Sequence, residues 1–152
     1  MTCAVVGIGR TTYSRNSGRT TRGMAVAACR DAIADAGLTT ADVDGICTFM
    51  ANDSEQPIFV GWALGIEELA WANAMYGGGN LVADQIATAA AVIEAGMCKA
   101  VLVYRSLNGR SGYRAPLDNF LWNLHSDNSV HLVLGRHWIF LRKQGKDAVL
   151  VP

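Results

Sequence analysis

Apolar residues along the chain alternate between short unbroken runs and longer stretches with a helical period. The run CAVVGIG (Cys3–Gly9) is typical of a strand that is covered on both faces. DGICTFM (Asp44–Met50) and KAVLVYR (Lys99–Arg105) have the same character. ELAWANAM (Glu68–Met75) indicates a further strand, although alanine and asparagine are weak strand formers. We therefore expect four strands.

Three helices are expected between these strands. Over residues 22–36, apolar side chains recur at three- and four-residue steps with charged side chains opposite them, and Gly37 provides a helix stop. The stretch 57–65, PIFVGWALG, opens with a proline, which suits a first helical turn. A third apolar helix follows the glycines of YGGGN and starts near Gly79 or Asn80.

The alternation of strands and helices predicts an α/β fold. Parallel pairing needs a crossover of about helix length, so the sheet is expected to be mostly parallel, with helices on both faces. Ligands in open sheets of this kind bind at the carboxyl ends of the strands, next to helix N-termini. Candidate chemistry is therefore sought where strands end.

Composition narrows the class of protein further. The chain has 152 residues, of which 51% are hydrophobic, with 13 basic and 13 acidic side chains, and this suits one globular domain. Scattered, balanced charges give no basic stripe for nucleic acid. No apolar run reaches the roughly 18 residues of a membrane span, and no signal peptide precedes the first strand. We expect a cytoplasmic protein with a small molecule or another protein as partner.

Two glycine-rich turns follow expected strands. The first, VGIGRTTYS, offers G-x-G but has Arg10 and Thr12 where a dinucleotide fingerprint continues to a third glycine. The acid expected at the end of the second strand also comes late, at Asn52 and Asp53. A turn that lets the chain leave a buried strand is the favoured interpretation. A nicotinamide or flavin site remains an alternative.

The second turn, YGGGN, lies at the tip of the third helix. A helix that begins there presents backbone N–H groups without internal partners and the positive end of its dipole, which favours an anion or a developing oxyanion. Glycines let a ligand approach the backbone closely. The same spacing also suits a tight strand-to-helix turn packed under a neighbouring element, and the two interpretations stay open.

Neither the cysteines nor the histidines indicate a metal site. The cysteines, which form no C-x-x-C pair, are Cys3, Cys29, Cys47 and Cys98. Buried free thiols are the better interpretation for them. The histidines, spaced by six residues, are His125, His131 and His137. That spacing does not place them together on one helix face, so packing or surface roles are expected.

Several blocks in order resemble a known family. AVVGIGRTTYSRNSGRT, ACRDAIADAGLTTADVDGI, ALGI, YGGGN and AAAVIEAGMCKAVLVYRSLNGRSG resemble the N-terminal half of the thiolase superfamily. Within it, they look like the lipid-transfer-protein-like, or sterol-carrier-like, thiolases. The resemblance covers about Thr2 to Gly112. It implies a thiolase-like layered half-domain over residues 1–112, followed by a diverged or truncated tail over residues 113–152.

The resemblance also implies what happens at the third helix. Members that exchange thioesters begin this helix with a nucleophilic cysteine, and aligning the helix ends puts Gly79 at that position. Cys47 and Cys98 are not close to it in sequence. A subgroup without the cysteine keeps a Gly-Gly-Gly turn and cleaves carbon–carbon bonds of steroid side-chain CoA thioesters. The implied substrate-binding residues are Gly77, Gly78, Gly79 and Asn80, with no catalytic residue, no metal and no cofactor besides the CoA thioester.

The remaining catalytic loops of the family have no counterpart in these 152 residues. They are a Gly-His-Pro loop, an Asn-Glu-Ala-Phe loop and a second Cys-x-Gly segment, all in the C-terminal half. We therefore expect an acyl-CoA-handling protein that is inactive alone and that forms a homo-oligomer or binds a partner subunit. The apolar cluster Trp138–Leu141 must be buried on something. Alternatives are a non-enzymatic acyl-CoA or lipid binding module, and a small nucleotide-binding domain.

Overall fold

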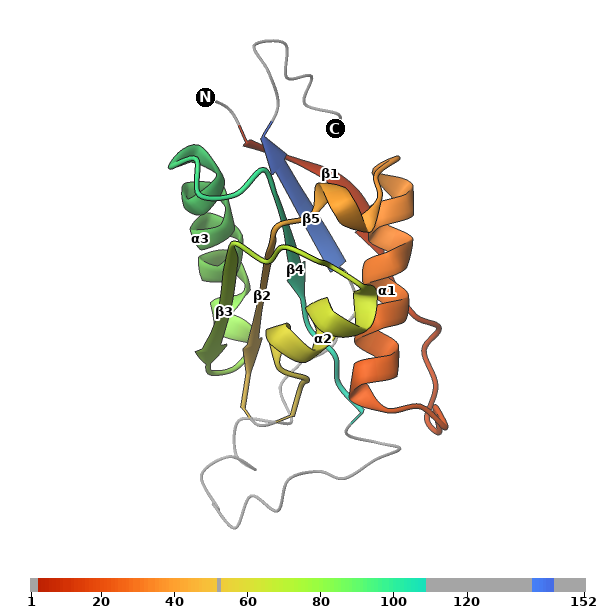
Figure 1. The fold of residues 1–152 in the computed structure, drawn as a ribbon. Coiled ribbons are helices and arrows are strands. Elements are labelled where there is room, and N and C mark those ends of the chain that lie inside the picture. The colour runs from red at the N-terminus through yellow and green to blue at the C-terminus, as the bar shows by residue number, and fades with distance from the viewer. Residues whose placement is uncertain (1–2, 52, 109–137, 144–152) are drawn as a thin grey trace.

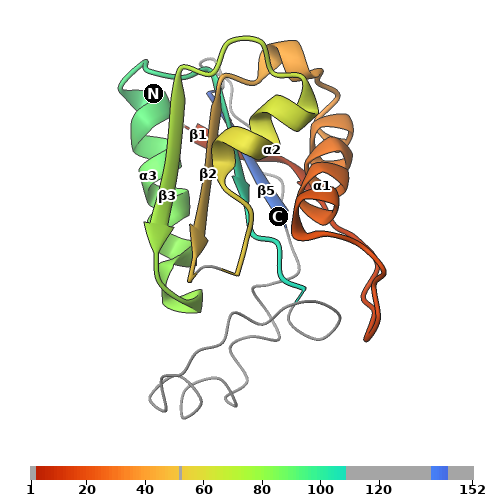
Figure 2. The same ribbon diagram turned by 60° about the horizontal axis from the view of Figure 1, so that its bottom comes forward.

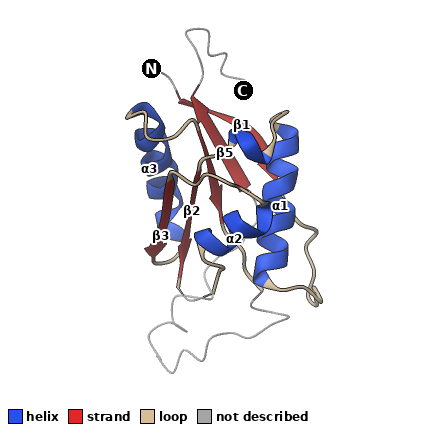
Figure 3. Ribbon diagram, in the orientation of Figure 1, coloured by secondary structure: helices blue, strands red, loops and turns tan. Residues whose placement is uncertain are grey.

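The computed structural model describes residues 3–51, 53–108 and 138–143. Helices and strands alternate along it (Figure 1; Figure 3). The strands are β1 (Cys3–Gly9), β2 (Gly45–Met50), β3 (Trp71–Tyr76), β4 (Ala100–Tyr104) and β5 (Trp138–Lys143). The helices are α1 (Thr21–Asp35), α2 (Pro57–Leu64) and α3 (Val82–Glu94), with 3-10 turns η1 (Thr40–Asp42) and η2 (Gly79–Leu81).

One five-stranded sheet has the order β1-β5-β4-β2-β3. β2 pairs in parallel with both β3 and β4, so Cys47 lies opposite Asn73 on one side and Val103 on the other. β5 pairs antiparallel with β4 and with β1. β1, β2, β3 and β4 therefore all run in the same direction. The expected α/β fold with a mostly parallel sheet is confirmed, and its four expected strands are present.

β5 was not expected as a strand. The sequence predicted only that Trp138–Leu141 would be buried, and the backbone of this segment instead fills the gap between β1 and β4. A strand that joins two others far from it in sequence leaves no local signal of its partners. The proposed division of the chain near residue 112 stays a prediction.

Helices cover both faces of the sheet. α1 and α2 lie on one face and α3 on the other, as the two views show (Figure 1; Figure 2). Alternate strand residues point to opposite faces. Ile46, Leu102 and Tyr104 therefore pack in a core with α1 and α2, whereas Cys47 and Val103 pack with α3. The expectation of helices on both faces is confirmed.

The first G-x-G pair has a packing role. Gly7 and Gly9 are buried within β1, and a Cβ atom at either position would overlap the backbone of α1, at Ala32 and at Ala28 respectively. The helix therefore packs directly on the strand because both glycines lack side chains. Both glycines lie in the strand, as the run Cys3–Gly9 predicted, and they serve close packing of α1 and not the turn that the G-x-G motif suggested.

Element ends differ slightly from those expected. Pro57 occupies the first turn of α2, as predicted, and Gly37 follows α1 with φ +66°. β3 begins at Trp71 and not at Glu68, because the N–H groups of Ala70 and Trp71 first reach the Asp44 carbonyl oxygen, at 2.8 and 3.2 Å. At the third helix, Gly79 opens a 3-10 turn and the α-helix starts three residues later.

The four cysteines form no disulfide with one another, and most of them are buried. Cys29, Cys47 and Cys98 are buried as expected, whereas Cys3 is only half-buried. The three histidines lie outside the described residues. Within the described ranges, no helix is both long enough and apolar enough to cross a membrane.

Candidate functional site

The glycine turn joins the edge strand β3 to α3. The Gly77 N–H donates to the Met50 carbonyl oxygen at 3.0 Å, which fixes the turn against the end of β2. Gly77 has φ +156°, and a Cβ there would overlap the Leu81 side chain. Gly78 is extended, and its carbonyl oxygen accepts the Leu81 N–H at 3.1 Å. The turn is thus tightly packed at Gly77, while Gly78, Gly79 and Asn80 form the tip of the helix.

The helix tip offers main-chain donors and no reactive side chain. Gly79 and Asn80 start the helical segment, so no preceding helical carbonyl lies in position to accept their N–H groups. The dipole of the following 13-residue helix adds positive potential at the same place. An anion or a developing negative charge on oxygen is stabilised by this arrangement. Glycine has no nucleophilic side chain, so it cannot form a covalent bond to the ligand.

Neither nearby thiol is an activated nucleophile. Cys47 lies inside β2 against α3, and burial raises the pKa of its thiol to about 12. Cys98 precedes β4, at the opposite end of the strands, and its Sγ donates to the Asp44 carbonyl oxygen at 3.6 Å. Burial and the Asp44 carboxylate raise the pKa of this thiol to about 11. Both thiols stay protonated at neutral pH, whereas the attacking species is a thiolate.

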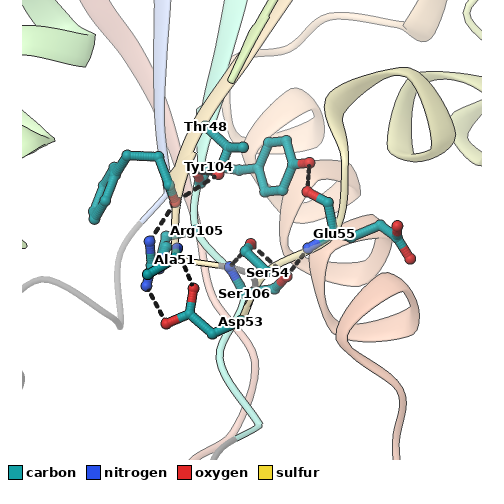
Figure 4. A network of polar contacts seen from close by, with 9 residues as sticks. Thr48, Ala51, Asp53, Ser54, Glu55, Tyr104, Arg105 and Ser106 are labelled. Carbon is teal, nitrogen blue, oxygen red and sulfur yellow. Dashed lines mark hydrogen bonds and ion pairs between the residues drawn. The ribbon is translucent and has the colours of Figure 1, made fainter. Parts of the chain in front are cut away.

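A polar network lies at the carboxyl ends of β2 and β4, beside the glycine turn (Figure 4). The Arg105 guanidinium pairs with Asp53 through Nη2 and donates to the Phe49 carbonyl oxygen through Nη1. Its Cζ atom lies 4.5 Å from the centre of the Phe49 ring. Arg105 is only 5% exposed. Burial lowers the pKa of Arg105, and Asp53 opposes that effect. The buried positive charge is therefore stabilised by the groups that contact it.

Hydroxyl groups complete the network. Ser54 Oγ and Ser106 Oγ are 3.0 Å apart, and the Ser106 N–H donates to Ser54 Oγ at 3.0 Å. The Tyr104 hydroxyl donates to the Glu55 carbonyl oxygen at 2.5 Å. The Thr48 hydroxyl donates to the Tyr104 carbonyl oxygen. The loop after β2 is thereby fixed to the end of β4, next to the main-chain bond that holds the glycine turn.

Sequence reasoning had noted Asp53 but not its role. It was considered as a late acid in a dinucleotide fingerprint, and the structure shows it bonded to Arg105 and to the Ala51 N–H at 2.9 Å. Arg105 was counted as the end of a strand. The available signal was a charged residue of each sign directly after two buried strands, since parallel strands end at the same edge of a sheet. Asn52 lies outside the described residues.

Two carboxamide side chains, one fully buried and one half-buried, face the side of the sheet that α3 covers. Gln85 is fully buried on the stripe of α3 that includes Ala89 and Ile93, and neither Oε1 nor Nε2 has a hydrogen-bond partner within the described residues. Asn73 Oδ1, on β3 beside Cys47, also lacks one there. Such groups cost stability unless they are satisfied. No signal in the sequence had pointed to either residue.

The described residues contain no cluster of side chains that could bind a metal ion. In the described parts of the chain, no group of three histidine, cysteine, aspartate or glutamate side chains is arranged to hold a metal ion. The assignment of Gly77 to Asn80 to substrate binding remains a prediction at this point. What the structure adds is their common position at the carboxyl edge, where Figure 1 places the tip of α3 beside the end of β2.

Comparison with known proteins gives consistent matches. The chain is 42% identical over 111 residues to a 17-hydroxy-3-oxo-4-pregnene-20-carboxyl-CoA lyase of Mycobacterium tuberculosis, covering 73% of this chain and 28% of the lyase. It is 41% identical over 114 residues to a steroid side-chain-cleaving aldolase of Thermomonospora curvata, covering 75% of this chain and 29% of the aldolase. The chain thus spans less than a third of the length of these relatives. No family model matches it.

Solved structures support the same fold. A chain in a structure titled Ltp2-ChsH2(DUF35) aldolase matches with a TM-score of 0.70 and 41% identity, over 74% of this chain and 29% of that chain. An SCP2-thiolase-like protein from Mycobacterium smegmatis matches with a TM-score of 0.51 and 21% identity, over 70% of this chain and 24% of that chain. The second likeness concerns the fold alone. The fold of the chain is therefore that of part of a thiolase-like domain.

Proposed function

We propose that the chain is part of an acyl-CoA-handling protein that cleaves a carbon–carbon bond in a steroid side-chain CoA thioester. The observation that carries the proposal is the tip of α3, where Gly79 opens the helical segment and offers main-chain N–H groups but no reactive side chain. The resemblance seen in the sequence implies a cysteine at this place in acyl-transfer members of the family. The relatives at 41% and 42% identity are named as steroid side-chain-cleaving and steroid acyl-CoA-cleaving enzymes. A lyase of this type needs no acyl-enzyme.

The proposed chemistry is a retro-aldol reaction. A base removes the proton of a hydroxyl group β to the thioester carbonyl, and the bond between the α and β carbons breaks. The hydroxyl carbon becomes a ketone, and the bonding electrons form a thioester enolate that then takes up a proton. Main-chain donors at Gly78, Gly79 and Asn80 would stabilise the enolate oxygen. The base is expected to come from a partner subunit, or from a region that corresponds to the part of the relatives outside the match.

The polar network supports the pocket indirectly in this proposal. Arg105 and Asp53 fix the loop after β2, and the Met50 carbonyl oxygen at the end of β2 holds Gly77. The donors at the helix tip are thereby preorganised, which is what such stabilisation requires. No cofactor is proposed besides the CoA group of the substrate. A cytoplasmic location, where CoA thioesters are made and used, is part of the same proposal.

Two alternatives make different predictions. A non-enzymatic acyl-CoA or lipid binding module would bind the same ligands without turnover. A nucleotide-binding domain would prefer NAD to acyl-CoA. The structure favours it least, because α1 covers Gly7 and Gly9, and Asp53 is engaged by Arg105.

Calorimetric titration of the chain with a steroid acyl-CoA, CoA and NAD separates these possibilities. We expect the acyl-CoA to bind most tightly and NAD not to bind. Gly79→Val should weaken acyl-CoA binding at least tenfold, because its side chain fills the approach to the N–H groups. The control is Ala95→Val, an exposed position at the other end of α3. Turnover is then assayed with and without a protein of the ChsH2(DUF35) type, which is named together with Ltp2 in the matched aldolase structure. Binding without turnover in every combination would favour the binding module.

A further inference from the structure

Basic residues are concentrated at the start of the chain. The first 30 residues contain five arginines and no aspartate or glutamate, although the whole chain has equal numbers of basic and acidic side chains. The arginines are Arg10, Arg15, Arg19, Arg22 and Arg30. Three of them lie in the exposed segment that connects β1 to α1. This segment is the most strongly basic stretch of the described chain.

Some of these arginines are engaged and others are not. Arg22 pairs with Glu55 at 2.9 Å and lies 5.1 Å from the centre of the Phe59 ring. Arg10 and Arg19 are exposed, and within residues 3–51 and 53–108 neither forms an ion pair. Two positive charges on one loop, without an acidic partner there, raise the local potential for an anion.

The same loop lines an open surface cavity of about 230 Å³. Its described lining residues are Arg10, Thr11, Thr12 and Tyr13, which supply one guanidinium and three hydroxyl groups. The volume is below the roughly 300 Å³ at which pockets for whole drug-sized ligands begin. It suits a phosphate-bearing part of a larger ligand. Guanidinium and hydroxyl donors are the side chains that bind phosphate oxygens.

Hydrogen bonds fix the second half of the loop, after the residues that line the cavity. Ser14 Oγ donates to the Asn16 carbonyl oxygen at 2.6 Å. Asn108, which follows β4, donates through Nδ2 to the Arg19 carbonyl oxygen. Thr20 then caps α1, its Oγ1 accepting the Gly23 N–H at 3.0 Å. The backbone that carries Arg19 is therefore fixed, which reduces the entropic cost of binding at that residue.

The position of the loop suits one end of a long ligand. β1 and β3 run in the same direction at opposite edges of the sheet, so the loop after β1 and the glycine turn after β3 lie at the same end (Figure 1; Figure 2). Four strand spacings separate them, about 19 Å. A ligand with an acyl thioester at one end and phosphates at the other can reach both.

We propose that the cavity at Arg10–Tyr13, together with Arg19, binds phosphates of the 3′-phosphorylated adenosine diphosphate group of an acyl-CoA. This assignment rests on the proposed function, because the cavity would bind the CoA end of the same substrate. Arg10 contacts the phosphates from the cavity wall. Arg19, at the other end of the loop, contributes by its charge. The acyl thioester lies toward Gly79.

The test uses adenosine 3′,5′-bisphosphate, which carries two phosphates and no acyl arm, titrated into the full chain at two salt concentrations. The Arg10→Gln/Arg19→Gln double variant should bind at least tenfold more weakly, and binding should weaken with salt. The control double variant, Arg30→Gln/Lys99→Gln, changes the net charge equally at two exposed positions outside the loop. It should stay within twofold of the wild type. An equal loss in both variants, or no wild-type binding at millimolar ligand, overturns the assignment.

A second titration separates this assignment from the proposed function. If a steroid acyl-CoA binds and Gly79→Val weakens it, but the double arginine variant does not, the proposed function survives and the phosphate site is wrong. If the double variant weakens both CoA and acyl-CoA while the acyl group adds no affinity over CoA, the phosphate site is supported and the steroid proposal fails. Loss of acyl-CoA affinity in both the arginine and the Gly79 variants supports both.

Discussion

Arg105 and Asp53 connect the end of β4 to the loop after β2 through an ion pair in which the arginine is almost wholly buried. The pair lies beside the main-chain bond that holds the glycine turn, so its integrity and the shape of the helix tip are linked. A buried charge that loses its partner is strongly destabilising, whereas loss of both partners is far less so. That asymmetry gives the first prediction.

Asp53→Ala should lower the free energy of unfolding by about 3 kcal/mol, because it leaves the Arg105 guanidinium buried and unpaired. The double variant Asp53→Ala/Arg105→Met should recover much of that loss, since methionine removes the buried charge and keeps volume near Phe49. Urea denaturation followed by circular dichroism measures both. A double variant that is less stable than Asp53→Ala would show that the guanidinium is stabilising without its carboxylate.

Much of the secondary structure could be predicted from the sequence. The runs at Asp44–Met50 and Lys99–Arg105 correctly predicted strands, because a strand covered on both faces is apolar at every position. The run at Cys3–Gly9 also predicted a strand, although Val5 and Ile8 in it are each 50% exposed. The helices followed from their period and their glycine and proline signals. The order of strands could not follow from local pattern, since β5 lies between β1 and β4 only through pairing with distant segments.

The sequence likewise predicted some residues of the candidate site and not others. The glycine turn was predictable because glycines before an apolar helix have a local meaning. Arg105 and Gln85 were not, because each is explained only by what surrounds it in three dimensions. The tip of α3 and the loop after β1 lie at the same end of the sheet because β1 and β3 run in the same direction, and the alternation of elements did predict function at that end.

Replacement of Gln85 should stabilise the chain. The carboxamide is fully buried and unpartnered in the described structure, and burial of such a group costs about 1–3 kcal/mol. Gln85→Met keeps a similar volume without hydrogen-bonding groups, so we expect the melting temperature to rise by several degrees. Gln85→Ala is the control, because it removes the same amide but leaves a cavity and should not stabilise. A lower melting temperature for Gln85→Met would mean that water or another group satisfies the amide.

Stability should fall at alkaline pH. The folded-state pKa values of Cys98 and Cys47, about 11 and about 12, lie above the ordinary thiol value. Below the ordinary thiol pKa, these thiols are protonated in both the folded and the unfolded state, and their full contribution to stability is present. As pH rises above it, the unfolded state loses protons first, and each thiol lowers stability by about 1.4 kcal/mol per pH unit until its folded pKa is reached. Urea denaturation between pH 8 and pH 11 measures this slope.

The variant Cys98→Ala separates the thiols from other titrating groups. It should be less stable than the wild type at pH 8, because it loses a buried side chain, but it should lose stability less steeply as pH rises. An unchanged slope in this variant would assign the alkaline effect to other groups, such as Tyr104, whose pKa is also raised by burial.

The outer face of α2 should drive association. The helix PIFVGWAL has no polar side chain, and Ile58, Phe59 and Trp62 are 65%, 48% and 76% exposed. A helix that is apolar all round is normally covered. Ile58→Gln/Trp62→Gln should shift the chain toward monomer in sedimentation velocity. Met97→Gln, a change at an exposed apolar residue elsewhere, is the control. Oligomers that persist in the double variant, or dissociate equally in the control, would assign association to another surface.

The tip of α3 is the centre of the account, and a cysteine placed there tests it most directly. A thiol at a helix N-terminus has a lowered pKa, below the roughly 8.5 of free cysteine. The pH dependence of alkylation by iodoacetamide measures that pKa in Gly79→Cys and in Ala95→Cys, which lies at the other end of the same helix. We predict a pKa below 8.5 for the first and above it for the second. An equal or higher pKa at position 79 would contradict an anion-stabilising helix tip.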